Sequence, residues 1–170
     1  MKIILTLLFV LVLSSVNAQE INVVKDAEPN LKENEILDVK ISFNNIYNEI
    51  AEFEIKETLP QGITLIDSDN YETEYYNGIP VKVLKWQITA NPNELIVINY
   101  KIKPDNLGDY SIKPTMVTDK KTNNIYKSQV FDFFVNCRSN NICGENENSL
   151  NCAEDCKTGI KDNICDYKLD

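Results

Sequence analysis

Residues 37–67 read LDVKISFNNIYNEIAEFEIKETLPQGITLID, and this stretch decides the fold. Apolar and polar residues alternate along 39–43 and again along 52–56. Alternation with a period of two places one face of a strand on a core and the other in water. Leu-Pro-Gln-Gly at 59–62 then forms a turn, because proline fixes φ and glycine accepts positive φ. The stretch therefore predicts two strands, a turn and the start of a third strand.

The same pattern extends in both directions along the chain. Strands are predicted over residues 21–25, 36–44, 51–58, 62–66, 81–88, 95–103, 110–119 and 125–135. Residues 26–35 read as a loop, whereas the tyrosine-rich segment 67–77 fits either a strand or a long loop. Pro114 predicts an edge or a bulge within 110–119, with Ile112 and Met116 pointing inward.

Seven or eight short strands with turns roughly every 8–12 residues predict an all-β fold, an immunoglobulin-like antiparallel β-sandwich. No amphipathic helix of useful length is predicted, and Phe131, Phe133 and Phe134 are expected to close the sandwich. No cysteine precedes Cys137, so the core must hold by packing. The residues expected in that core are Phe43, Phe53, Trp86, Tyr100, Ile41 and Ile98.

The N-terminus has the pattern of a secretory signal peptide. Lys2 precedes the apolar run 3–13, and small residues lead to Ala18. This run is too short to cross a membrane as a helix of about 20 residues. We expect residues 1–18 to be removed, which predicts a secreted or cell-surface location with no transmembrane segment afterwards. The alternative is an uncleaved membrane anchor.

Charge and composition exclude several classes of function. The chain carries 26 acidic and 17 basic residues, a net charge of −9, and this argues against a nucleic-acid-binding protein. It contains no histidine, which removes histidine-dependent nucleophilic, zinc and general-base sites. A glycosidase built on two carboxylates stays formally open. We expect a protein that is not an enzyme.

Several motifs resemble the DUF11-type repeat domain. They are Val39-x-Ile41-x-Phe43-x-Asn45, Glu57-x-Leu59-Pro60-x-Gly62-Ile63-x-Leu65, Trp86-x-Ile88 and Ile98-x-Tyr100-x-Ile102-x-Pro104. The resemblance covers roughly residues 20–135 and implies an immunoglobulin-like module of a prokaryotic surface protein, without catalytic residues. Two features depart from the family: Glu57 stands where an aspartate is usual, and the domain occurs once instead of in tandem.

All five cysteines lie in the last 34 residues of the chain. In a secreted protein, clustered cysteines predict a disulfide framework. The candidates are Cys137, Cys143, Cys152 and Cys156, which allow three connectivities, while Cys165 is expected to be free or to pair with another chain. Zinc bound by four thiolates is the alternative.

The tail resembles a short cysteine-rich, acidic repeat that occurs at the ends of archaeal and bacterial surface proteins. Asn141-Ile142-Cys143 returns as Asn163-Ile164-Cys165, and the second copy is incomplete. We therefore expect three parts: a signal peptide (1–18), a sandwich (19–135) and a tail (136–170) that ends partway through a second repeat. The chain would then be a truncated product or a fragment of a longer surface protein.

Two segments are candidate binding sites. The tail offers hard oxygen donors that suit Ca²⁺, although the helix-loop-helix calcium pattern is not met, and the alternative is a solvated acidic loop. These candidates are Glu145, Glu147, Glu154, Asp155, Asp162 and Asp166. The second segment holds Tyr71, Tyr75 and Tyr76, which suit contact with a glycan or a protein, or else half-bury in a strand. No other cofactor is expected.

These features together predict a structural or adhesive module, with other surface proteins or cell-envelope glycans as its partners. A binding module that uses residues 71–76 is the alternative.

Overall fold

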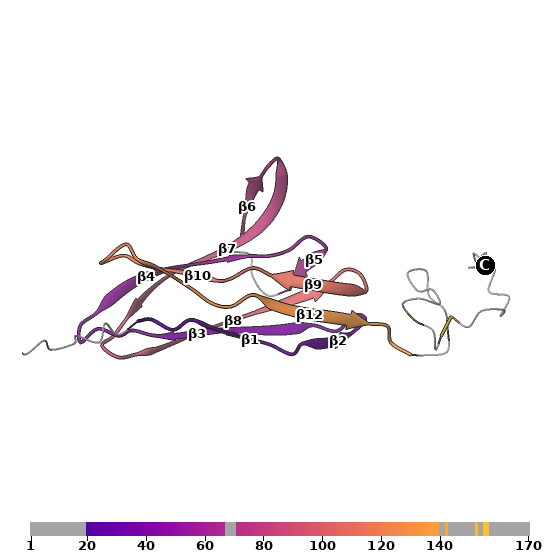
Figure 1. Cartoon of the computed structure of the whole chain (residues 1–170), viewed down its shortest axis with the longest axis horizontal. Helices are drawn as coiled ribbons and strands as arrows, with labels where there is room; N and C mark the ends of the chain where they lie inside the picture. Colours follow the sequence, from indigo (N-terminus) through magenta and orange to yellow (C-terminus); the bar gives the residue numbers. More distant parts are fainter. Residues whose placement is uncertain (1–19, 67–70, 140–141, 143–151, 153–154, 157–170) are drawn as a thin grey trace, which may run out of the picture.

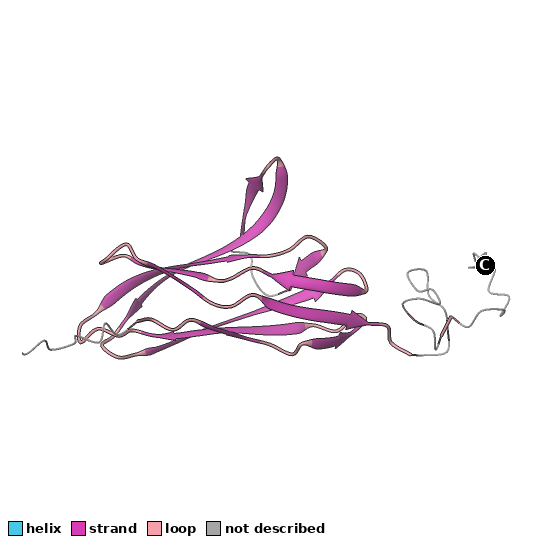
Figure 2. Ribbon diagram, in the orientation of Figure 1, coloured by secondary structure: helices cyan, strands magenta, loops and turns pink. Residues whose placement is uncertain are grey.

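The computed structural model describes residues 20–66, 71–139, 142, 152, 155 and 156. Every regular element in this part of the chain is a strand (Figure 2). The first six are β1 (Val24–Asp26), β2 (Asn30–Lys32), β3 (Leu37–Asn44), β4 (Ala51–Thr58), β5 (Ile63–Leu65) and β6 (Tyr71–Tyr76). The other six are β7 (Ile79–Ala90), β8 (Leu95–Pro104), β9 (Gly108–Ile112), β10 (Met116–Asp119), β11 (Ile125–Lys127) and β12 (Phe131–Asn136).

The strands form three sheets. Their orders are β1-β3-β8-β5, β11-β10-β4-β7-β6 and β2-β12-β9. Paired strands run antiparallel, except that β2 and β12 are parallel. Figure 1 shows the four-stranded and five-stranded sheets as two facing layers. This is an immunoglobulin-like β-sandwich, and it confirms the predicted fold class.

Alternating residues of the two layers fill the core between them. Every second residue of β3, from Leu37 to Phe43, is buried, and Phe53 and Ile55 of β4 are buried opposite them. Five of the six predicted core residues are buried. Trp86 differs, since it is only partly buried and packs against the core with its ring 6.1 Å from that of Tyr100.

Two of the predicted long strands each prove to be two strands in different sheets. β9 belongs to the three-stranded sheet, and after Pro114 the chain continues as β10 in the five-stranded sheet. Proline has no N–H for a ladder, so pairing ends there. The break also shifts the alternation by one residue, which buries Val117 and leaves the predicted Met116 only partly buried.

The chain changes sheet a second time between β11 and β12, beside the first change at Pro114. β11 pairs with β10, but β12 pairs with β9. The Thr115 amide donates to the Ser128 hydroxyl at 3.0 Å, and the Ser128 amide donates to the Thr115 carbonyl at 3.1 Å. These bonds join the two points at which the chain changes sheet.

Two smaller predictions also need correction. The predicted loop 26–35 contains β2, whose Leu31 is buried. Phe134 points outward and is 39% exposed, so Phe133 closes the core without it.

Candidate functional site

A hairpin made by β6 and the start of β7 projects from the sandwich (Figure 1). β6 pairs with residues 79–84, whereas β4 pairs only with residues 83–90 of β7. The distal part of the hairpin is therefore a two-stranded ribbon. Its turn has positive φ at Asn77 (53°) and Gly78 (81°), as a tight two-residue hairpin turn requires.

The register of the hairpin divides its tyrosines between two faces. Tyr71 lies opposite Leu84 and Tyr75 lies opposite Pro80, while Tyr76 lies opposite Ile79. Side chains alternate along a strand, so Tyr71 and Tyr75 share one face and Tyr76 lies on the other. The structure thus separates a group that the sequence offers as one cluster.

All three tyrosines are exposed. Tyr75, near the tip, is 72% exposed, compared with 46% for Tyr71 and 42% for Tyr76. An isolated two-stranded hairpin is at best marginally stable in water, so contacts at its base must hold it in place.

A groove of about 370 Å³ lies on the side of Tyr71. The turn that follows β4 contributes Pro60 and Gln61, and Asp105 comes from the segment after β8. Thr73 of β6 and Pro80 of β7 also line it. Proline and tyrosine rings offer flat apolar surfaces, and the other side chains offer hydrogen-bonding groups. Ligand sites combine such apolar surfaces with a small number of hydrogen-bonding groups.

Hydrogen bonds hold the groove in shape. The Lys82 ammonium donates to the Ile63 carbonyl at 2.7 Å, which ties the hairpin to the turn. The Thr64 hydroxyl donates to Asp105 Oδ1 at 2.8 Å, and the Asp105 amide donates to the Gly62 carbonyl at 2.8 Å. Gly62 has φ of 70°, which a side chain would strain.

The opposite face carries an ion-pair network that ties the hairpin to β4. The Lys56 ammonium lies 2.7 Å from Glu74, and Lys85 lies 3.1 Å from the same carboxylate. These two lysines lower the pKa of Glu74 to about 2. The ammonium groups of Lys56 and Lys113 lie 5.9 Å and 5.5 Å from the centroid of the Tyr76 ring. The Tyr76 ring therefore makes cation–π contacts with two lysines of the same protein.

The sequence predicted the turn at 59–62 but not its part in the groove, which depends on the register of β6.

The sequence analysis did not predict a charged pair in the core. Lys25 and Glu57 are fully buried, and their side chains lie 2.7 Å apart. Both occupy inward positions of their strands, since Lys25 continues Ile21 and Val23, and Glu57 continues Phe53 and Ile55. The position of each charged residue in the alternation of its strand was the sequence signal that could have indicated this buried pair.

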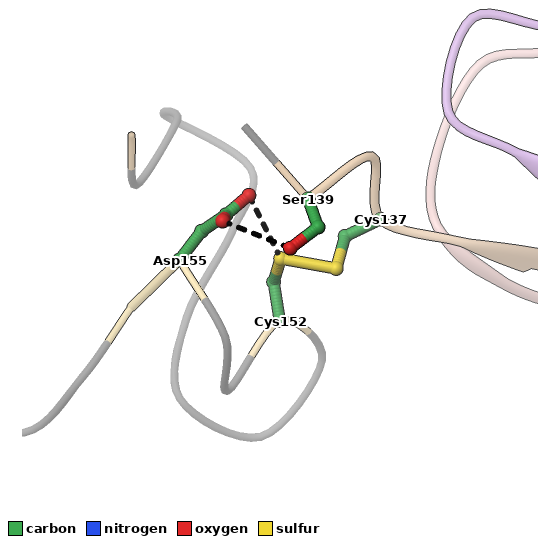
Figure 3. The surroundings of a disulfide bond; sticks show 4 residues. All are labelled: Cys137, Ser139, Cys152 and Asp155. Carbon is green, nitrogen blue, oxygen red and sulfur yellow. Dashed lines mark hydrogen bonds between the residues drawn. A yellow bond between two sulfur atoms is a disulfide. The ribbon is translucent and has the colours of Figure 1, made fainter. Parts of the chain in front are cut away.

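The start of the tail contains a disulfide between Cys137 and Cys152, with Cα atoms 5.5 Å apart (Figure 3). Cys156 is also disulfide-bonded. Cys143 and Cys165 lie outside the described residues, as do the predicted signal peptide and the incomplete second repeat.

Of the six calcium candidates, only Asp155 lies within the described residues. It is buried, and the Ser139 hydroxyl donates to its Oδ1 at 3.3 Å (Figure 3). Cys152 Sγ lies 3.5 Å from its other oxygen. Glu145, Glu147, Glu154, Asp162 and Asp166 are not described. Within the described ranges, no three His, Cys, Asp or Glu side chains are grouped to hold a metal. No helix there is long and apolar enough to cross a membrane.

Comparison with known proteins gives structural likeness only. No protein-family model matches the chain, and no curated protein matches its sequence. A CARDB domain from Pyrococcus furiosus, crystallised with di-metal ions, is 17% identical, with 70% of this chain and 94% of that domain covered and a TM-score of 0.46. A cohesin module of a Clostridium perfringens family 33 glycoside hydrolase is 10% identical, with 69% and 98% covered and a TM-score of 0.43.

A β-glucuronidase of Bacteroides uniformis is 14% identical and has a TM-score of 0.39, with 65% of this chain but 12% of the enzyme covered. These identities and TM-scores are too low to carry an argument about this chain. Its own strand order establishes its fold as an immunoglobulin-like β-sandwich.

Proposed function

We propose that this chain is a secreted, cell-surface-associated, non-catalytic module that attaches to a cell-envelope glycan or to another surface protein through its projecting hairpin. The sandwich acts as a rigid support, and the Tyr71 and Tyr75 face of β6 makes the contact. The tail, from residue 136 onward, is an anchoring segment that is cross-linked by disulfide bonds. The resemblance to DUF11-type domains and the N-terminal apolar run are the sequence support for a surface location.

The observation that carries this proposal is the exposure of Tyr71 and Tyr75 beside the groove. Tyrosine supplies a large, rigid contact area at little conformational cost, which makes it common in binding surfaces. The ion pairs on the other face hold the ribbon in place, so binding need not first order it.

The proposal can be tested on an array of envelope glycans and surface proteins. The array is probed with the labelled, oxidised protein. The matched variant replaces Tyr71 and Tyr75 with serine, and a thermal melt checks that its sandwich is intact. We expect the natural chain to bind at least one class of probe and the variant to lose that binding. Equal binding by both proteins would place the contact elsewhere and reject the hairpin.

Calcium binding by the tail stays a prediction from sequence. Calorimetric titration of the oxidised protein measures it independently of the hairpin.

A further inference from the structure

Lys25 and Glu57 form a closed polar site inside the sandwich. Lys25 belongs to β1 in the four-stranded sheet, and Glu57 belongs to β4 in the five-stranded sheet. Lys25 Nζ lies 2.7 Å from Glu57 Oε1, and neither side chain is exposed. Such a pair is costly to bury as two charges.

Burial changes the protonation chemistry of both groups. It lowers the pKa of Lys25, although the charge of Glu57 opposes the change. It raises the pKa of Glu57, against the effect of Lys25. Both directions favour transfer of the shared proton from nitrogen to oxygen, which leaves an amine beside a carboxylic acid.

The neighbours of the pair match an amide group. Lys25 Nζ also donates to the Lys113 carbonyl at 2.5 Å, and the Thr115 hydroxyl donates to Glu57 Oε2. An amide has one N–H donor and one carbonyl acceptor. The Lys113 carbonyl would accept from that N–H, and the Thr115 hydroxyl would donate to that oxygen, so the buried product would have both polar groups satisfied.

We propose that Lys25 and Glu57 condense into an amide bond that covalently joins the two sheets. In this reaction, the lone pair of the neutral Lys25 amine attacks Glu57 Cδ. The Cδ–Oε1 bond then breaks, and Oε1 leaves as water with the proton it carries and one proton from the nitrogen. Oε2 stays as the amide oxygen. No oxidant, metal or other reactant is needed.

Three features of the site favour this reaction. The two groups are held in contact, which replaces an encounter by a fixed approach. The Thr115 hydroxyl donates to the oxygen on which negative charge develops during the attack. The product is neutral, so the cost of burying two charges disappears. The bond would cross-link a sandwich whose sequence contains no cysteine before Cys137.

The mass of the full secreted chain, reduced and denatured, tests the proposal. We expect a mass one water below that of the sequence with the same N-terminus. After tryptic digestion, the peptide with Lys25 should be joined to the peptide with Glu57, and cleavage after Lys25 should be absent.

Two variants serve as controls. Lys25→Arg keeps the positive charge but has no amine nucleophile, so its mass should equal that of its sequence. Glu57→Gln must also lose the water signal, because reaction at its amide carbon would expel ammonia. The proposal would be overturned if the folded natural chain, after prolonged incubation, still had the full mass of its sequence. In that case Lys25 and Glu57 would be found in separate linear peptides. This test does not depend on the hairpin.

Discussion

The ring of Phe43 meets the ring of Phe53 edge-on, with centroids 5.3 Å apart and planes at 79°. Phe43 comes from the four-stranded layer and Phe53 from the five-stranded layer, so this contact joins the two halves of the sandwich. An aromatic pair of this kind contributes about 0.5–1.5 kcal/mol beyond the area it buries.

Replacing Phe53 with alanine should therefore destabilise the sandwich strongly. The side chain is 1% exposed, and truncation of a buried phenylalanine costs about 3–5 kcal/mol. Urea denaturation measures the change. Tyr75→Ala, at a position 72% exposed, is the control and should change stability by no more than about 0.5 kcal/mol. Similar losses for the two variants would contradict the assignment of the core.

Asn45 should tolerate alanine better than aspartate. Its buried amide nitrogen donates to the carbonyl oxygens of Glu49 at 3.0 Å and Asn91 at 2.8 Å, and its oxygen accepts from the Tyr47 amide. Alanine loses these bonds at about 1–3 kcal/mol. Aspartate places a carboxylate against carbonyl oxygens, which adds repulsion. Thermal melts at neutral pH measure the order, and aspartate equal to or better than alanine would contradict it.

Glu74 should titrate near pH 2 in the folded protein. Lys56 and Lys85 hold its pKa below the ordinary value of 4.5. Because the folded pKa is depressed, the contribution of this carboxylate to hairpin stability is complete above pH 4.5 and is lost as the pH falls to about 2. Carbon-detected NMR of the side-chain carboxyl measures the midpoint. In Lys56→Met the midpoint should rise, and an unperturbed midpoint in the natural chain would argue against the network.

The disulfide between Cys137 and Cys152 should stabilise the tail without supporting the sandwich. It lies after β12, which ends at Asn136, and it joins residues 15 apart in sequence. In Cys137→Ser/Cys152→Ser, the unfolding transition followed by Trp86 fluorescence should move by less than about 0.5 kcal/mol. Proteolysis of the tail should become faster. A large loss in the Trp86 transition would mean that the tail supports the sandwich.

The sequence was sufficient for the strands that alternate cleanly. The predicted bounds of β4 match the structure, because residues 51–56 alternate cleanly and the turn at 59–62 ends the strand. It was insufficient where the chain changes sheet. At Pro114 and at Ser128 the hydrogen-bonding partners of the chain change, and those partners are set by residues far away in the sequence.

The candidate site was predictable only in part. Its tyrosines are visible as a tyrosine-rich run, but their division between two faces depends on the register of β6 against β7. The groove needs Asp105 and the turn at 59–62 to meet, which no local pattern indicates.

The most direct test of the account compares single tyrosine variants for binding to whichever array probe the natural chain recognises. Tyr71→Ala and Tyr75→Ala should each weaken affinity by about tenfold or more, a loss of roughly 1.4 kcal/mol, because both lie on the groove side. Tyr76→Ala should bind nearly as the natural chain does, since Tyr76 lies on the opposite face. Equal losses for all three variants, or a loss confined to Tyr76→Ala, would contradict the assignment of the binding face.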